Sequence, residues 1–237
     1  KPVSCEDITE IINRPSVFLG FRSAGLPMDE LRGLLEQSAG LLRLSGETIE
    51  SIVSFIGGIP SPGQLFQLGS MLGRPCRDIR LCVNRLGFDM VPGWLSGMGW
   101  QGDMKALTDI LGVLAPIVRT FAIDLNLTET GISGDIGIEC YMDWEEKDPG
   151  IWAGFLDRLA DYVPIHPSKR SGLLQYPGEL TLPVSRRKEN PDAISLLLCK
   201  MIHHIKLSFG KGMISGAKAY LAIYRPGIQP GNNWLAE

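Results

Sequence analysis

Two stretches of the chain alternate between apolar and polar residues as β-hairpins do. In Phe121–Trp144, every second residue of each run is apolar, and a glycine-containing turn separates the two runs. A similar pattern occurs in His203–Pro226, around the turn Gly210-Lys211-Gly212. Side chains alternate between the two faces of a strand, so each hairpin should have one apolar and one polar face. A further alternating strand is predicted at Ile79–Asn84.

Helical spacing of apolar residues dominates the beginning of the chain. We predict that residues 1–75 form a helical N-terminal region, with helices at Glu6–Asn13, Asp29–Leu44, Glu47–Ile56 and Ser61–Leu72. A Gly- and Trp-rich connector is expected from Pro92 to Trp100. Two later helices, Asp103–Ala115 and one from Asp148 to about Tyr162, each begin at an aspartate suited to the N-cap position.

The segment between the two hairpins is harder to assign. Residues 164–191 contain many prolines, glycines and charges, which predicts a long loop with at most a short helical turn at Ser168–Leu174. Residues 192–199 fit either a helix or the start of a long strand. The order after residue 76 is therefore β, α, ββ, α, ββ.

Hairpins impose antiparallel pairing, so this order predicts an α+β fold. We expect a single domain over residues 1–237, with a mostly antiparallel sheet in residues 76–237 and helices packed on its apolar face. A shift of 82 residues places the first hairpin, 121–144, on the second, 203–226, with five identical residues. This likeness indicates either a duplication or the ordinary similarity of alternating strands.

The polar faces of the predicted strands carry the candidate functional residues. Three are candidate catalytic groups: Asp124, Glu139 and His204. Seven are candidate ligand-binding groups: Arg80, Asn126, Tyr141, Lys206, Lys218, Tyr220 and Tyr224. Convergent polar groups on a concave surface or in a barrel lumen are typical of small-ligand sites. The alternative is a solvated sheet face, which antiparallel sheets often have.

The two acidic candidates suggest proton transfer. The turn of the first hairpin is expected to place Asp124 nearly opposite Glu139. Two carboxylates that close would raise the pKa of one of them, which could then act as a general acid or base. The competing interpretation is a salt bridge from either carboxylate to Arg80 or Lys206.

The basic and aromatic candidates suggest an anionic ligand. Lys206 and Lys218 are expected on the two arms of the second hairpin, beside Tyr220 and Tyr224. Cations beside aromatic rings would suit a ligand that bears phosphate or carboxylate. Lysine and tyrosine are equally common on ordinary strand surfaces.

Motifs for metals and cofactors are weak. His203 and His204 are adjacent in a strand, where they should point to opposite faces and cannot chelate together, so no metal site is predicted. The glycines around Gly134 lack the helix that a dinucleotide fingerprint needs, and the second-hairpin turn lacks the P-loop frame. A Cys82–His204 nucleophile pair stays open. The cofactor, if there is one, is unknown.

Composition narrows the partners and the compartment. A net charge of −3 gives no electrostatic reason for nucleic acid or an anionic membrane surface as partner. The five cysteines are scattered and show no CxxC spacing, which favours reduced thiols in a cytoplasmic protein. No apolar run approaches the roughly 20 residues that a membrane span needs. Oligomeric state cannot be inferred.

Two functions are compatible with these patterns. The alternation of helices and antiparallel strands around a polar interior face resembles, in layout, the ααββ barrels of aromatic and peptide prenyltransferases. A small biosynthetic or tailoring enzyme, transferase- or cyclase-like, would act on a small molecule or peptide bound at the polar face. The other hypothesis is a non-catalytic ligand- or peptide-binding protein that uses this face or an exposed strand edge.

Overall fold

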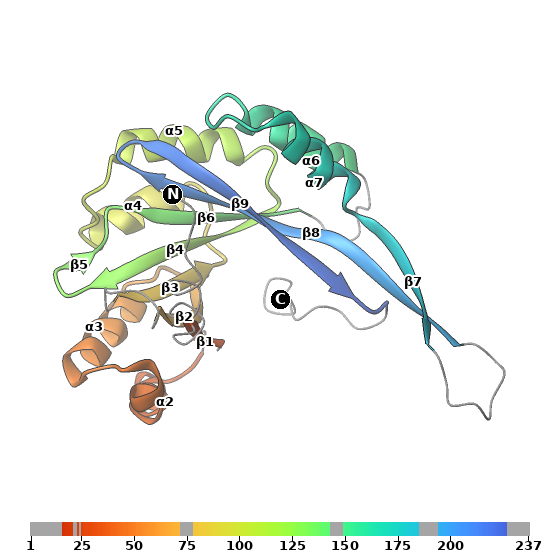
Figure 1. The fold of residues 1–237 in the computed structure, drawn as a ribbon. Coiled ribbons are helices and arrows are strands. Elements are labelled where there is room, and N and C mark those ends of the chain that lie inside the picture. The colour runs from red at the N-terminus through yellow and green to blue at the C-terminus, as the bar shows by residue number, and fades with distance from the viewer. Residues whose placement is uncertain are drawn as a thin grey trace, which may run out of the picture.

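The computed structural model describes residues 16–20, 23, 25–71, 78–142, 149–184 and 194–226. These residues form six helices and one nine-stranded sheet in which all pairings are antiparallel (Figure 1). The strand path runs β1-β2-β3-β4-β6-β8-β7, with β5 paired to β4 and β9 paired to β8. The predicted α+β class with a mostly antiparallel sheet is confirmed.

The strands are β1 (Ser16–Gly20), β2 (Gln64–Met71), β3 (Ile79–Asn84), β4 (Thr120–Thr128), β5 (Gly131–Ile132), β6 (Ile136–Tyr141), β7 (Gly178–Val184), β8 (Ile194–Gly210) and β9 (Met213–Tyr224). The helices are α2 (Met28–Leu42), α3 (Gly46–Gly57), α4 (Met90–Gly97), α5 (Met104–Leu114), α6 (Pro149–Leu159) and α7 (Pro167–Gln175).

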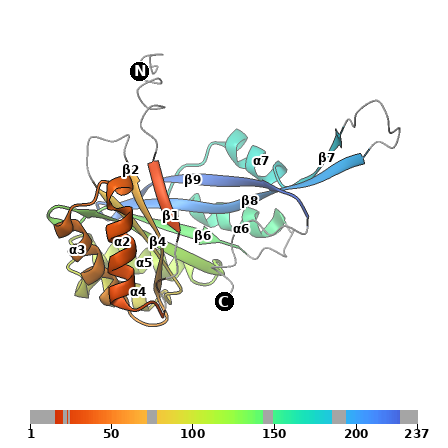
Figure 2. The same ribbon diagram turned by 90° about the horizontal axis from the view of Figure 1, so that it is seen from below.

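Helices α2 to α6 bury their apolar stripes against one face of the sheet. The resulting core joins side chains such as Leu35 of α2, Ile52 of α3 and Phe155 of α6 to Leu81 of β3 and Ile138 of β6. In the view of Figure 2, α2, α3 and α4 lie together beside the first strands of the sheet. The opposite face of the same strands carries the polar residues.

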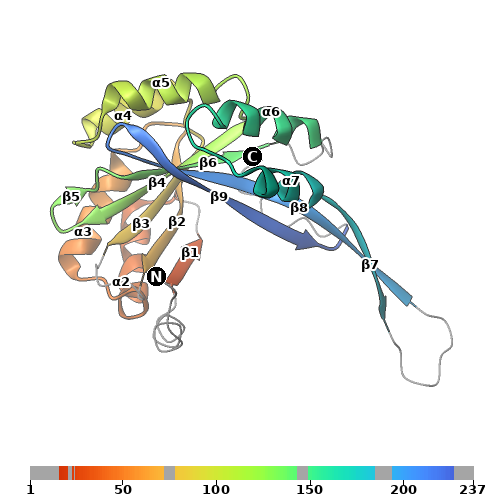
Figure 3. The same cartoon turned by 45° about the horizontal axis from the view of Figure 1, so that its top comes forward.

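Strand β8 connects two parts of the sheet. Its residues 205–209 pair with β6, its residues 194–200 pair with β7, and β9 pairs along 199–210 on the other side. Beyond the end of β6, strands β7, β8 and β9 continue as an arm that projects from the body (Figure 3). The strand path does not close within the described residues, since β1 pairs only with β2 there. The barrel lumen considered from the sequence is therefore an open sheet in this part of the chain.

Several predicted elements are found close to their expected bounds. Strand β3 spans the residues predicted for it, and α2, α3 and α5 differ from prediction by a few residues at their ends. Asp103 caps α5, because its carboxylate accepts a hydrogen bond of 2.9 Å from the backbone N–H of Ala106. The second hairpin turns at Lys211-Gly212, where both residues have positive φ as a tight two-residue turn requires.

The helix predicted at Ser61–Leu72 is wrong, because Gln64–Met71 is strand β2. Leu65 and Leu68 are three residues apart, a spacing that also occurs on one face of a helix. In the structure a register shift between Leu65 and Gln67 marks an irregularity of the β-bulge kind. The extra residue turns both leucines into the core from a strand. With β1, this makes the described part of residues 1–75 a mixture of strands and helices.

Two segments assigned as irregular are regular. Most of α4 lies in the segment expected to be a connector, Pro92–Trp100. A proline is compatible with this helix because Pro92 lies in its first turn, where the missing N–H costs no helical hydrogen bond. The long loop predicted at 164–191 contains α7 and strand β7. Strand β7 lies at the edge of the sheet, a position that tolerates Pro183. Residues from Ile194 onward are strand, which resolves the helix-or-strand alternative for that part.

Some predictions fall outside the described residues. They are the helix at Glu6–Asn13 and the capping role of Asp148. In the described residues, no helix is long and apolar enough to cross a membrane.

Leu35→Ala should lower the free energy of unfolding by about 2–5 kcal/mol, because it removes a buried side chain from the contact of α2 with the core. The matched control is Leu34→Ala, its exposed neighbour on the same helix, which should change stability by about 0.5 kcal/mol or less. Urea denaturation followed by circular dichroism measures both. Equal losses in the two variants would contradict the placement of α2.

Candidate functional site

The polar face of the sheet brings candidate residues from five strands into adjacent rows. One row runs Cys82, Asp124, Gly137, Ser208, Gly216 across β3, β4, β6, β8 and β9. The next row runs Asn84, Ala122, Glu139, Lys206, Lys218. In a preceding row, Arg80 pairs with Asn126, and its Nε donates a 2.8 Å hydrogen bond to the Asn126 amide oxygen.

Lys206 links the two carboxylates of this face. Its ammonium group forms an ion pair with Asp124 Oδ2 and lies 3.5 Å from Glu139 Oε1. Arg80 approaches Asp124 Oδ2 from the other side, at 3.6 Å. The cluster thus holds two cations and two carboxylates, whose mutual attraction offsets the cost of removing them from water.

Gly137 makes room for this arrangement. It lies on β6 between Asp124 and Ser208, and the Lys206 side chain passes over it to reach Asp124. A Cβ atom at Gly137 would lie 2.6 Å from Lys206 Cε and 3.0 Å from Asp124 Cβ. The missing side chain is therefore what lets a lysine on β8 pair with an aspartate two strands away.

The predicted arrangement of the two carboxylates is wrong in register. Asp124 lies opposite Gly137, and Glu139 lies opposite Ala122, so the two acids are not directly across the hairpin from each other. The register depends on the short strand β5, which pairs with the end of β4 before β6 begins and which the sequence pattern does not reveal. Lys206 contacts both acids, as the salt-bridge interpretation required.

Three polar side chains lie close to the Glu139 carboxylate. Its Oε2 accepts a 2.6 Å hydrogen bond from the Tyr141 hydroxyl, and its Oε1 faces Lys206 and, at 3.7 Å, His204 Nε2. Burial raises the pKa of Glu139 above its ordinary value of 4.5, although the Tyr141 hydrogen bond lowers it by less. Burial and the Glu139 charge raise the pKa of Tyr141, which keeps its hydroxyl protonated and able to donate.

His203 and His204 do not point to opposite faces, contrary to the sequence-based expectation. A register shift in β8 between Ile202 and His204 leaves His203 as an extra, bulged residue. The two Nδ1 atoms lie 2.6 Å apart, so one imidazole donates to the other. Burial, with a smaller contribution from His203, lowers the pKa of His204 from 6.5 to about 3. His204 is therefore neutral at physiological pH.

Aromatic rings surround His204. Tyr220 of β9 stacks on its imidazole with ring centroids 4.2 Å apart, and Tyr141 lies 4.9 Å away on the side of Glu139. Tyr220 is exposed, so one aromatic ring of the site is open to a ligand.

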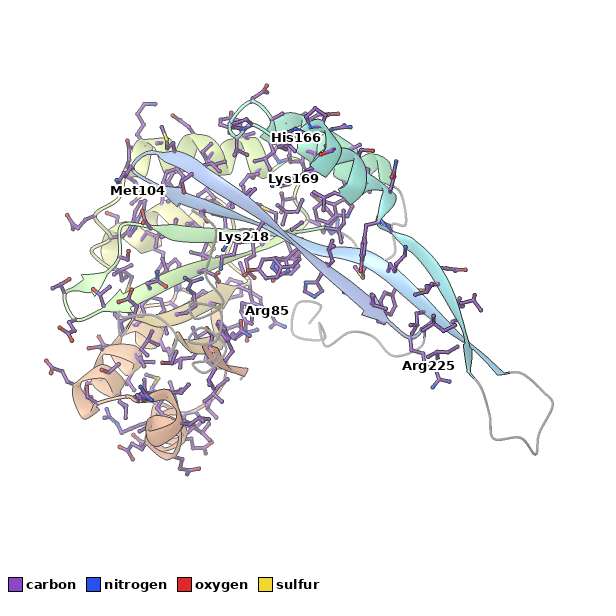
Figure 4. The ribbon with its side chains drawn as sticks, in the orientation of Figure 1. Arg85, Met104, His166, Lys169, Lys218 and Arg225 are labelled. Atoms are coloured by element: carbon purple, nitrogen blue, oxygen red, sulfur yellow. The ribbon has the colours of Figure 1, made fainter. Side chains whose placement is uncertain are left out.

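Lys218 and Tyr224 lie farther out than their sequence pattern suggests. Lys218 is across from Lys206 on β9 but is exposed, midway along the strand (Figure 4). Tyr224 pairs with Cys199 on the arm, four residues along β9 from Tyr220. The structure therefore gathers eight of the ten candidates in the cluster and leaves these two at or beyond its rim.

Cys82 lies on the expected face but in an apolar setting. It packs with Phe66, Ala122 and Tyr141, and burial raises the pKa of its thiol to about 12. A thiol with that pKa is a poor nucleophile at neutral pH, so the structure disfavours a Cys82–His204 pair. Phe66 was missed from the sequence because its segment had been assigned to a helix.

The cluster differs from residue to residue in its access to solvent. The Asp124 side chain is 1% exposed, whereas Glu139 retains 13% and Arg80 14%. Within the described part of the chain, Asp124 Oδ1 and His204 Nε2 have no hydrogen-bond partner. Buried polar atoms left unpaired are uncommon in folded proteins and are often found at functional sites. Searched over the same residues, the structure shows no group of three or more metal-ligating side chains.

Comparison with known proteins identifies no relative: no protein-family model, no curated protein and no solved structure matches this chain.

Gly137→Ala should lower the free energy of unfolding by about 1–3 kcal/mol, because the added methyl group displaces Lys206 from Asp124. The matched control is Gly216→Ala, in the same row on β9, where a Cβ meets nothing within 4 Å. Alanine favours a strand over glycine, so the control should be neutral or more stable by up to about 1 kcal/mol. Chemical denaturation measures both variants, and equal behaviour would contradict the close approach.

His204→Gln should change how stability depends on pH. The pKa of His204 is about 3 in the folded protein and about 6.5 in the unfolded chain. As the pH falls below about 6.5, the unfolded chain therefore binds a proton at this histidine before the folded protein does. His204 thus contributes stability that is complete above pH 6.5 and is lost toward pH 3, at up to about 1.4 kcal/mol per pH unit. Glu139, with its raised pKa, acts in the opposite direction in both proteins. Denaturation curves of wild type and variant between neutral and acidic pH should diverge; parallel curves would contradict the burial of a neutral His204.

Proposed function

We propose that the polar face of the sheet is the site of a small biosynthetic or tailoring enzyme that uses general acid–base catalysis. The observation that carries the proposal is the position of Glu139. Its carboxyl has a raised pKa, keeps partial access to solvent, and contacts a tyrosine hydroxyl and a lysine ammonium. Active sites often hold a carboxyl group with a raised pKa, which can donate or accept a proton during the reaction.

The other members of the cluster fit distinct roles. Asp124 is too buried to touch a substrate and serves to position Lys206. Lys206 and Arg80 present positive charge beside Glu139, which would stabilise negative charge that develops on a substrate. His204 is neutral, and its Nε2, which has no hydrogen-bond partner among the described residues, lies 3.7 Å from Oε1 of Glu139.

The rim of the site favours a ligand with an anionic or planar group. Tyr220 has an exposed ring that stacks on His204. Lys218 is also exposed and lies two residues from Tyr220 on the same face of β9. A small molecule or peptide that bears a carboxylate or phosphate would meet a cation and an aromatic ring here. The transferase- or cyclase-like reaction inferred from the sequence belongs to this proposal.

A second candidate function is a non-catalytic binding protein. The balance of two cations against two carboxylates favours it, because a fully paired cluster can be purely structural. In that case the exposed Tyr220 and Lys218 would bind a ligand without proton transfer. The two candidates differ in what Glu139 does.

Glu139→Gln should abolish proton transfer while preserving the shape of the site and the acceptor for Tyr141. General acid–base groups contribute about 10²- to 10⁴-fold, so turnover should fall by at least about 10²-fold with ligand affinity little changed. Mass spectrometry of the compound or peptide that co-purifies with the protein identifies the ligand. Turnover is then followed by chromatography and affinity by calorimetry.

The control is Glu129→Gln, an exposed glutamate in the turn between β4 and β5, which should have wild-type turnover. Unchanged turnover in Glu139→Gln would overturn the enzyme proposal. A wild-type protein that binds the ligand and leaves it unaltered would establish the binding protein instead.

A further inference from the structure

The outer edge of β9 has no partner strand within the described residues. Strand β9 pairs with β8 along one side, and none of the described strands lies along its other side. Such an edge presents a row of backbone donors and acceptors, which proteins usually protect with prolines, several charges or strong bulges. Strand β9 reads MISGAKAYLAIY, with one charged residue and no proline. The register shift of β9 falls at Ser215, so within the described part of the chain the edge from Lys218 onward is open to pairing with a further strand.

The second half of β9 exposes two large apolar side chains to solvent. Leu221 is 48% exposed and Ile223 is 56% exposed. They pair with Ile202 and Lys200 of β8, on the face where Ile202 belongs to the main core. The apolar face of the body therefore continues along the arm and is open to solvent at its β9 edge.

We propose that a second copy of this chain covers this edge, with the two β9 strands antiparallel about a two-fold axis at Leu221. Lys218 then lies opposite the partner's Tyr224, Ala219 opposite the partner's Ile223, and Leu221 opposite the partner's Leu221. The paired segment runs from the middle of β9, marked by Lys218 in Figure 4, almost to Arg225 at its end. Such an isologous pairing closes the assembly at two subunits.

The side chains favour this register over axes nearer the start of the strand, and an axis at Ala222 would pair only Tyr220–Tyr224 of β9. A two-fold axis at Lys218 would set two ammonium groups against each other, which is destabilising. An axis at Leu221 gives each Lys218 an aromatic neighbour, the partner's Tyr224. It also sets the two large aliphatic residues, Leu221 and Ile223, against apolar side chains on one face. Axes at Ala219 or Tyr220 would leave Leu221 and Ile223 facing only alanine or serine.

The dimer would extend the polar face across its seam. Tyr220, a member of the cluster, and Lys218, at its rim, also lie on the paired segment of β9. The partner's Tyr224 would come beside Lys218, so each site would gain an aromatic residue from the other subunit. This dimer does not depend on whether Glu139 is catalytic, so turnover and oligomeric state can be tested separately.

Sedimentation velocity of the full chain over a wide range of concentrations tests the pairing. Wild type should form a dimer, and Leu221→Glu should weaken it by at least about tenfold because two carboxylates would meet at the axis. The matched control is Met213→Glu, 61% exposed on the same strand but outside the paired segment, which should dimerise as wild type does. Circular dichroism verifies that both variants fold.

A cysteine at the axis provides a second measurement. Directly opposed residues of an antiparallel pair have Cβ atoms about 4.5–5.5 Å apart, close enough for a disulfide after slight adjustment. Leu221→Cys should therefore give a covalent dimer on oxidation, and Met213→Cys should give no more than the background of the native cysteines. A monomeric wild type, a dimer that survives Leu221→Glu, or equal cross-linking at both positions would overturn the proposal. A monomer that instead binds extended peptides along β9 would also overturn it.

Discussion

The ion pair between Lys206 and Asp124 is the constraint on which the polar face depends. Burying a carboxylate such as Asp124 is costly unless a cation meets it, and the cation of the neighbouring strand β3, Arg80, comes no closer than 3.6 Å. The closer cation, Lys206, comes from β8, two strands away, and reaches Asp124 only because β6 has a glycine at position 137. The β4–β6 and β6–β8 registers must both be correct for the pair to form. A one-residue slip in either register would leave the buried charge of Asp124 without its lysine partner.

The two faces of the sheet therefore stabilise the fold in different ways. On one face, five helices bury a continuous apolar core, which is non-directional and tolerates small adjustments. On the other, hydrogen bonds and ion pairs impose fixed distances between particular residues. Helices and strands both contribute to the apolar core, and the polar face adds specificity of strand register. A site built on the polar face is positioned by rigid strands, not by loops.

Sequence patterns predicted the elements whose signal is local and periodic. The stripe of α5, its Asp103 cap and the alternation of β3 needed no tertiary information. The failures share a cause: in β2 and at His203, register shifts break the two-residue period, so that one pattern resembled a helix and two histidines were assigned to opposite faces. Most candidate residues were placed on the right face, because alternation fixes faces. Their mutual distances were not predictable, since register and the gap at Gly137 depend on strands far apart in sequence.

The bulge at His203 links the hydrogen-bonding state of His203 to the protonation of Nε2 on His204. Two imidazoles joined through their Nδ1 atoms share a single hydrogen, which belongs to one ring or the other. When His203 holds it, the Nε2 of His204 must carry a hydrogen and presents a donor to Glu139. When His204 holds it, the same Nε2 presents a lone pair. A change of hydrogen-bond partner at His203 would thus invert the polarity that Glu139 meets, without any movement of the backbone.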